Sequence, residues 1–352
     1  MRFIGRLILS AVFLALAAAL MAAAMYLPAP IFSFYTDFTR DAAAFLSGIT
    51  ASFPFAVWEV LLAIVVLLEL YGLIRCFSTG KFLRWIAGLV LLVSILAFLF
   101  VGLWGVNHFG TPVAQRVGLT VTKYSKDQLA DATRYMANKA NVWAEQVERD
   151  ANGDLAIDFE AMAETAKDGY EKMAQTNGFF RLPDTTVKPL LTSKAFSYMG
   201  ITGIYIAYTG ESCVNTDTYP ASIPFTMCHE LAHSLTVAPE DEANFCAFLA
   251  CLNNDDPAFQ YSAWYSAYIY TYNALAKVDS AAAAEIRSTL SETVLRDVRR
   301  ASEHYDQYEG EVQETAEKLN DLYLKTFQDE SGVQSYGEVT DLLIAWYLQN
   351  VR

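Results

Sequence analysis

The chain has 352 residues, of which 54% are hydrophobic, and its formal net charge is −14 at pH 7. A strongly acidic surface repels phosphate, so the charge argues against nucleic acid as a partner. The length suggests two or three structural units. The five cysteines form no Cys-x-x-Cys pair, so we expect buried free thiols rather than a thiolate zinc site or a redox pair.

Three apolar stretches, at roughly residues 7–27, 55–73 and 86–106, are each long enough to cross a hydrocarbon core, which needs about 20 apolar residues. The first could also be a cleaved signal peptide, but its length favours a retained anchor. Beyond about His108, charged residues occur every few positions. The sequence therefore predicts a three-helix transmembrane anchor over residues 1–107 and a soluble domain over residues 108–352.

The distribution of basic residues predicts the orientation of the anchor. The connection that carries Arg75, Lys81 and Arg84 is the most basic, which is typical of a cytoplasmic segment. We interpret residues 28–54 as a loop on the opposite side. A cytoplasmic amino terminus and three spans then place the soluble domain outside the cytoplasm of a bacterial cell, in a multi-pass membrane protein.

Glu59 and Glu69 lie within the second predicted span. An ionisable group in a bilayer is costly unless it has a polar partner or lies near an interface. The two glutamates therefore either contact another span or the soluble domain, or lie at the membrane surface.

The soluble domain is predicted to be mainly α-helical with a small β-sheet. Residues 121–123 are β-like, and Ser125 with Gln128 resembles a capping box that begins a helix ending at about Glu148. Asp158 is the expected cap of a second helix that ends at Gln175. Residues 200–209 alternate in the pattern of a strand. Further helices are predicted over residues 241–252, 258–276, 280–308, 311–327 and 336–349.

The pentapeptide His229-Glu230-Leu231-Ala232-His233 contains half of the four histidines in the chain. Pro224 is well placed near the start of a helix here, because its missing N–H is not needed there. Residues four apart lie on one face of a helix, so the two imidazoles can bind a single Zn²⁺. Glu230 then lies where it can accept a proton from water. The sequence therefore predicts a zinc site with His229 and His233 as ligands.

A third ligand is expected from residues 240–244, which follow a chain reversal at residues 236–239. The arrangement resembles the Glu-x-x-x-Asp pattern of the gluzincin metallopeptidases, with Asn244 where Asp is usual. This resemblance implies that Glu240 binds zinc and that Asn244 orients a ligating imidazole. Glu242 lies on a different face of the predicted helix and is the alternative third ligand.

If the protein is a peptidase, Zn²⁺ lowers the pKa of water, and Glu230 transfers the proton to the leaving amine. In zinc peptidases of this type a strand edge binds extended substrate, which here corresponds to Gly203, Ile204, Tyr205, Ile206 and Ala207. A side chain that stabilises the oxyanion is also needed. The candidates are His304, Tyr305, Tyr323 and Tyr336.

The chain also resembles an uncharacterised bacterial membrane family, domain of unknown function 3810. The resemblance rests on stretches in the same order along nearly the whole chain: residues 53–55 with 58–59, 200–205, 214–217, 224–226, 229–233, 240–245, 320–325 and 335–337. It implies a zinc-peptidase-like domain on a membrane anchor and no established substrate. The family pattern often has Gln-Arg-Gly after the second histidine. This chain has Ser234-Leu235-Thr236 there, which affects the shape of the turn but not the ligands.

Our leading hypothesis is a membrane-anchored, zinc-dependent peptidase acting on an extracytoplasmic peptide or protein, with membrane lipid as its other partner. One alternative is a membrane scaffold or binding protein with a structural zinc ion. Another is a zinc hydrolase of a non-peptide envelope component. The general base Glu230 argues against the scaffold, whereas the sequence does not separate the two hydrolases.

Overall fold

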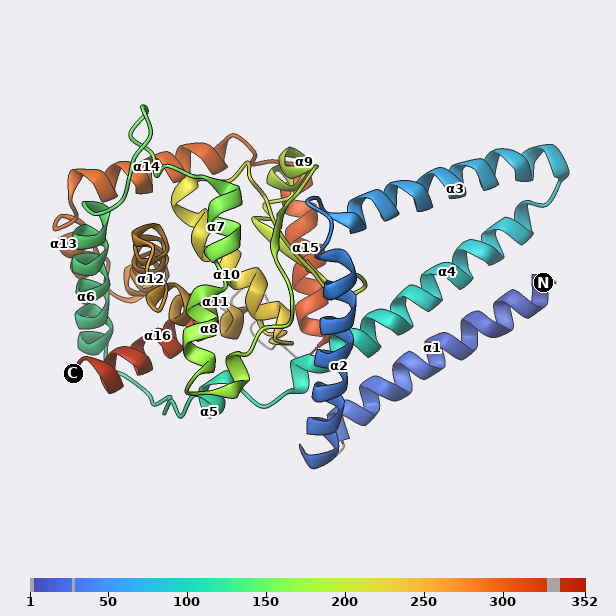
Figure 1. The fold of residues 1–352 in the computed structure, drawn as a ribbon, viewed down its shortest axis with the longest axis horizontal. Coiled ribbons are helices and arrows are strands. Elements are labelled where there is room, and N and C mark those ends of the chain that lie inside the picture. The colour runs from blue at the N-terminus through green and yellow to red at the C-terminus, as the bar shows by residue number, and fades with distance from the viewer. Residues whose placement is uncertain (1–2, 27–28, 328–335) are drawn as a thin grey trace.

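The computed structural model describes residues 3–26, 29–327 and 336–352, with side chains except those of residues 29–33 and 336–338. The helices α1 (Phe3–Tyr26), α3 (Val57–Thr79) and α4 (Phe82–Leu103) project from a larger helical body (Figure 1). Each is long and apolar enough to cross a membrane, α4 together with the 3-10 turn that follows it. The three predicted spans are therefore present as helices, although residue 27 of the first lies outside the described residues.

The segment between the first two projecting helices is itself a helix, α2 (Ala29–Thr50). The expectation that residues 28–54 form a loop is therefore wrong. α2 lies across the base of the projecting helices, against the body (Figure 1). It packs so closely that a Cβ added to Gly210 of the body would lie 2.6 Å from the backbone nitrogen of Ser47. Polar and apolar residues are mixed along α2, so it lacks the long apolar run by which a membrane span is recognised in a sequence.

The core of the body is a single large apolar cluster formed mainly by helices. At its centre α12 (Pro257–Val278) packs against α6 (Lys126–Ala144), α10 (Ile223–Ser234), α11 (Glu240–Leu252) and α16 (Tyr336–Asn350). The other helices are α5 (Val113–Arg116), α7 (Phe159–Thr165), α8 (Asp168–Ala174), α9 (Ser193–Tyr198), α13 (Ser280–Arg287), α14 (Glu292–Asp306) and α15 (Glu311–Thr326), with 3-10 turns at Gly105–Phe109, Gly178–Phe180 and Pro220–Ser222.

Local sequence signals place several helix ends correctly. The capping box at Ser125 and Gln128 is present, and the Asp158 side chain accepts a hydrogen bond from the backbone of Ala161. Two predicted helices are each divided: residues 158–175 into α7 and α8, and residues 280–308 into α13 and α14, where Ser291 provides a new cap. Residues 121–123 form no strand. All five cysteines are free and buried, which confirms that expectation.

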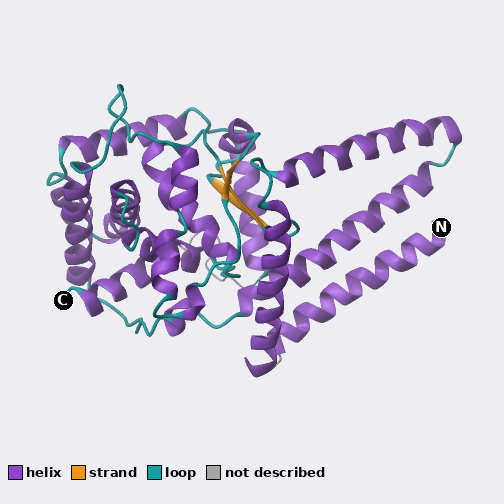
Figure 2. Cartoon of the chain, viewed as in Figure 1, coloured by secondary structure: helices purple, strands orange, loops and turns teal. Residues whose placement is uncertain are grey.

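A small sheet lies between the helical body and the projecting helices (Figure 2). It consists of β1 (Val187–Pro189), β2 (Gly203–Ile206) and β3 (Glu211–Val214) in the order β1-β3-β2, so β2 is an edge strand. β3 pairs in parallel with β1 and antiparallel with β2. The strand predicted over residues 200–209 is therefore shorter than expected, and β1 and β3 were not predicted. The mainly helical fold with a small sheet is confirmed.

Buried acidic groups join the sheet to the start of α3. The Glu211 carboxylate accepts hydrogen bonds from the first two backbone N–H groups of α3, at 2.8 and 2.9 Å, and from the Lys188 ammonium at 2.8 Å. Glu59, in the first turn of α3, accepts from the backbone N–H of Leu191 at 2.7 Å. Glu59 was expected either to make a polar contact with another span or the soluble domain, or to lie at the membrane surface. The structure shows the first of these, a polar contact with the body.

Candidate metal centre

A tight turn brings α11 back against α10. Thr236 in this turn has a φ of 66°, in the left-handed region that a β-branched residue rarely adopts. The turn is closed by the backbone N–H of Thr236, which donates to the carbonyl of His233 at 2.9 Å. Pro239 then precedes the first residue of α11, Glu240. Glycine, which often stands at this position in the family that the sequence resembles, adopts such a φ without strain, whereas Thr236 adopts it at the cost of strain.

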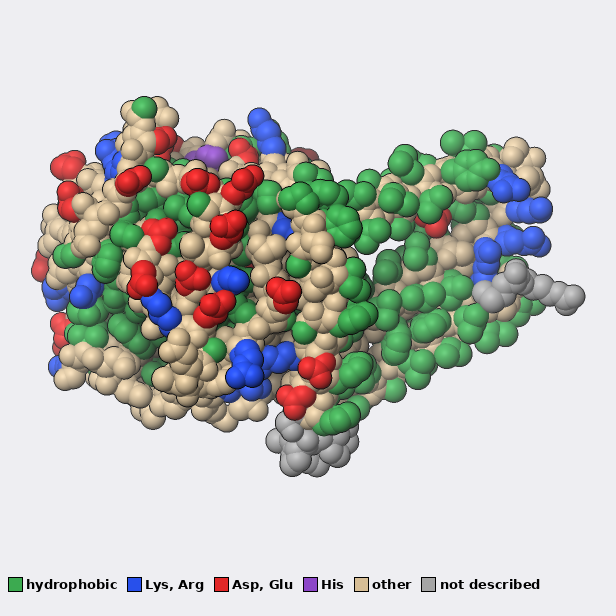
Figure 3. Space-filling model, in the orientation of Figure 1, with side chains coloured by type: hydrophobic (Ala, Val, Ile, Leu, Met, Phe, Trp, Pro, Cys, Tyr) green, Lys and Arg blue, Asp and Glu red, His purple; other side chains and the backbone are tan. Residues whose placement is uncertain are grey.

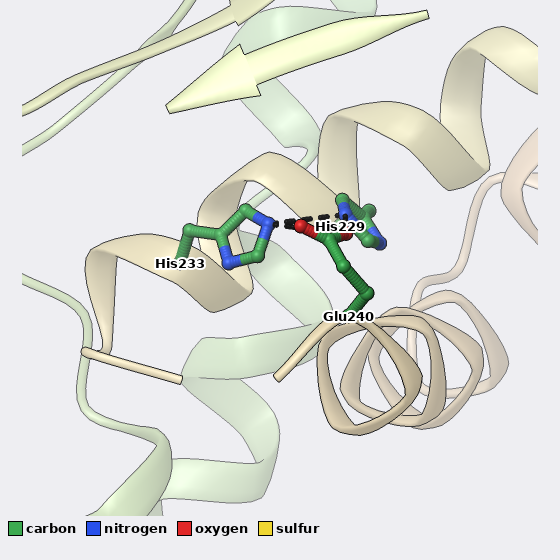
Figure 4. A group of neighbouring side chains, drawn as sticks. All are labelled: His229, His233 and Glu240. Atoms are coloured by element: carbon green, nitrogen blue, oxygen red, sulfur yellow. Dashed lines mark hydrogen bonds and ion pairs between the residues drawn. The ribbon is translucent and has the colours of Figure 1, made fainter. Parts of the chain in front are cut away.

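This turn brings His229, His233 and Glu240 together, with their ligand atoms all within 4.8 Å of one another (Figure 4). The Nε2 atom of His229 lies 3.1 Å from Glu240 Oε2 and 3.1 Å from His233 Nε2. The expected alternative ligand, Glu242, points elsewhere, and its Oε1 accepts a hydrogen bond from the backbone of Val113 at 2.9 Å. The geometry therefore favours Glu240 as the third ligand.

Both imidazoles are held by hydrogen bonds from their Nδ1 atoms. His229 Nδ1 lies 2.9 Å from Asn244 Oδ1, which also accepts from the Tyr270 hydroxyl at 3.1 Å. His233 Nδ1 lies 2.7 Å from the carbonyl oxygen of Val237. Because both acceptors are oxygens, each Nδ1 carries a proton, and each Nε2 faces the space between the three side chains. Asn244 is thus placed where a residue that orients a ligating imidazole is expected.

Glu230 lies between the histidines and the sheet. The residue is 2% exposed, and its Oε2 atom has no hydrogen-bond partner. Burial raises the pKa of Glu230 and the nearby histidines lower it, which leaves it at about 7. Its backbone carbonyl accepts a hydrogen bond from the Ser212 hydroxyl in β3 at 2.8 Å. A buried, unpartnered carboxylate with a pKa near neutrality can both accept and donate a proton.

The charges of the three grouped side chains are strongly linked. Burial lowers the pKa of His233, but the Glu240 carboxylate more than offsets this and raises it to about 9. Partial burial in turn raises the pKa of Glu240, and the two histidines outweigh this and hold it well below its usual range. Without a cation, the site therefore carries an imidazolium–carboxylate pair. A bound cation would displace that proton, because a metal ligand must be deprotonated.

The substrate strand proposed from the sequence lies beside this centre. A Cβ added to Gly203 in β2 would lie 2.4 Å from Glu230 Oε1, so only glycine lets the strand approach the carboxylate this closely. Ile204, Tyr205 and Ile206 continue the edge strand, while Ala207 follows its end. The Tyr205 ring lies 6.3 Å from the His233 ring. β2 therefore runs next to the group that would act as base.

Trp104 is a site residue that the sequence did not indicate. It follows the last residue of α4, and its ring packs edge-on against His233 with a centroid distance of 5.2 Å. Its Nε1 donates a hydrogen bond to the Tyr323 hydroxyl at 2.9 Å. In the sequence, Trp104 looks like part of an apolar span, and no spacing connects it with the histidines. The contact places the candidate metal centre directly at the end of a projecting helix.

The proposed oxyanion-stabilising residues have different positions. Tyr323 contacts the centre through Trp104. His304 Nε2 instead donates to the backbone carbonyl of Asp217 at 2.8 Å, and the Tyr305 hydroxyl lies 3.4 Å from that of Ser222. In the described part of the chain, no hydrogen bond or ring contact joins His304 or Tyr305 to the three grouped side chains. The Tyr336 side chain lies outside the described residues.

The model of a family described as a protein of unknown function (DUF3810) matches residues 35–344. The chain belongs to the DUF3810 family. The matched region contains the whole candidate metal centre, together with α3, α4 and most of α2. Neither the curated proteins nor the solved structures contain a match to this DUF3810 chain.

Proposed function

We propose that the protein is a membrane-associated, zinc-dependent peptidase with a gluzincin-like centre that cleaves an extracytoplasmic peptide or protein. The observation that carries this proposal is the grouping of His229, His233 and Glu240 around one point, with the buried Glu230 carboxylate alongside. Two imidazoles and one carboxylate form the donor set of a catalytic zinc site, and the adjacent acid lies where a general base is needed.

The residues fit the ion in three respects. Their ligand atoms converge within 4.8 Å. Both imidazoles present Nε2 because their Nδ1 atoms are engaged by Asn244 and Val237. The Glu240 side chain remains 38% exposed, so the centre is not sealed from substrate. When bound, Zn²⁺ supplies Lewis acidity, which lowers the pKa of water and polarises a carbonyl group.

The protein side chains supply the remaining steps. β2 would hold an extended peptide along its outer edge by backbone hydrogen bonds. Glu230 would accept a proton from the attacking water and return it to the departing amine, for which a pKa of about 7 is well suited. Trp104 and Tyr205 flank His233 and shield one side of the centre from water.

The test uses the full-length protein in lipid nanodiscs, with zinc measured by atomic emission and cleavage of a mixed peptide library measured by mass spectrometry. We expect about one zinc ion per chain, because the three ligand atoms converge on one point. We expect Glu230→Gln to keep the zinc and to lose cleavage by at least about 100-fold, the lower range for a general base. Glu242→Gln is the matched control, because Glu242 lies in the first turn of α11 beside Glu240 but points away from the centre, and this variant should keep both.

Zinc well below one equivalent, or unchanged cleavage in Glu230→Gln, would refute the proposal. Stoichiometric zinc without hydrolysis of any peptide would support a structural zinc in a scaffold instead. Hydrolysis confined to non-peptide envelope compounds would support the other hydrolase. The unpartnered Oε2 of Glu230 favours catalysis, because a structural site gives no reason to bury a carboxylate oxygen without a hydrogen bond.

A further inference from the structure

One face of α2 carries large apolar side chains that no other part of the described chain covers. Phe34, Phe38, Phe45 and Ile49 are 76%, 55%, 71% and 54% exposed, and we call these four residues the aromatic stripe. At about 100° per residue they lie within about 60° of the helix circumference. The exposure is therefore confined to one side of the helix rather than scattered over it.

The opposite face of α2 packs against the body. Ala43 and Ser47 are buried there, and a Cβ on Gly210 would lie 2.8 Å from the Ala43 carbonyl oxygen. The hydroxyl of Thr50 donates to the carbonyl of Thr209 at 3.1 Å. The aromatic stripe consequently points away from the body.

α2 is also held beside the ends of the membrane-spanning candidates. The Tyr35 hydroxyl donates to the carbonyl of Gly102, near the end of α4, and Thr39 Oγ1 lies 2.9 Å from Asn107 Oδ1 in the following 3-10 turn. The helix crosses the base of the projecting helices rather than running with them (Figure 1). In Figure 3, apolar side chains cover this end of the body and continue onto the projecting helices.

We propose that α2 lies in the plane of the lipid–water interface, with the aromatic stripe among the upper acyl chains. An amphipathic helix that lies in the interface has its apolar face among the upper acyl chains and its polar face at headgroup level. Asp37 and Asp41 lie along one edge of the stripe and would lie in the headgroup layer. Lipid is favoured over a protein partner because the stripe points away from the body, and the apolar helices α1, α3 and α4 lie on that side of α2 (Figure 1).

This placement goes beyond the proposed activity and does not depend on it. α2 contacts the turn that joins β2 to β3, and Trp104 contacts His233. An embedded α2 would therefore fix the candidate metal centre at a constant, short distance from the membrane surface, whatever reaction occurs there.

The test places a fluorescent label on the stripe in the full-length protein. All five native cysteines are buried, so a new surface cysteine is the accessible thiol. Phe38→Cys and Phe45→Cys, labelled with an environment-sensitive dye in liposomes, should lose most of their fluorescence to lipids that carry a nitroxide near the headgroup. A nitroxide deep in the acyl chain should quench them less, because an interfacial helix lies near the surface.

Val142→Cys is the matched control, because Val142 is an apolar residue with 55% exposure on α6, at the opposite end of the body from the projecting helices. Its label should keep its fluorescence with either lipid. An unchanged unfolding temperature shows that each variant is folded. The proposal is overturned if labels at 38 and 45 respond only to an aqueous quencher. It is also overturned if neither the nitroxide lipids nor the aqueous quencher reduces the fluorescence of these labels, which would indicate a protein partner or a second copy of the chain.

Discussion

The buried pair of Lys188 and Glu211 should be essential for stability. Their side chains are 3% and 0% exposed, and Glu211 also binds the first backbone N–H groups of α3. Glu211→Gln keeps the shape but leaves the buried ammonium without its counter-charge. Loss of one partner of a buried pair costs about 3–5 kcal/mol. At roughly 2–4 °C per kcal/mol for a domain of this size, Tm should fall by roughly 6–20 °C.

The assay is thermal unfolding of the full-length protein in detergent micelles. Glu314→Gln is the control, because Glu314 and Lys318 form an exposed pair with side-chain exposures of 68% and 77%, and such pairs contribute at most about 0.5 kcal/mol. The double variant Lys188→Met with Glu211→Gln should recover most of the lost stability, since it removes both buried charges. A loss below about 1 kcal/mol in Glu211→Gln, or a double variant no more stable than the single one, would refute the reasoning.

Three further predictions concern the candidate metal centre. Asn244→Ala should weaken zinc binding by about 10–100-fold in a chelator competition, because His229 loses the acceptor that orients its ring. Asn244→Asp keeps an acceptor oxygen and should keep the zinc affinity. Equal zinc affinities of the two variants would contradict this reasoning. In Gly203→Ala the new Cβ would lie 2.4 Å from Glu230 Oε1 and would displace the carboxylate. Peptide cleavage should fall by about 100-fold without loss of zinc, because a displacement of about 1 Å at a reacting group has that effect. Normal cleavage would show that the carboxylate has room to move. Zinc affinity measured by calorimetry should rise with pH up to about 9, because the metal-free His233 has a pKa of about 9 and its proton must leave before zinc binds. The same raised pKa stabilises the metal-free fold below the ordinary value of 6.5, and this contribution is lost as the pH rises through about 9. An affinity that does not change between pH 6 and 9 would exclude this proton as the competitor.

Short-range patterns in the sequence were sufficient for several features. The three apolar helices follow from uninterrupted hydropathy, because a lipid-crossing helix needs little beyond length and apolar side chains. The Ser125 capping box and the Asp158 cap depend on residues three positions apart. His229 and His233 share a helix face because their spacing matches one helical turn. All of these are local relations, which the order of residues alone specifies.

Contacts between distant segments decided the rest. α2 was missed because its apolar stripe is short and its other face is fixed only by packing on the body. β1 and β3 are too short, and β3 too completely buried, to show strand alternation. Residues 240 and 242 lie about 200° apart on a helix, so the sequence implies that only one of them reaches the histidines. Which one depends on how the turn at Thr236 docks α11 onto α10, and the tertiary structure brings Glu240 to the histidines.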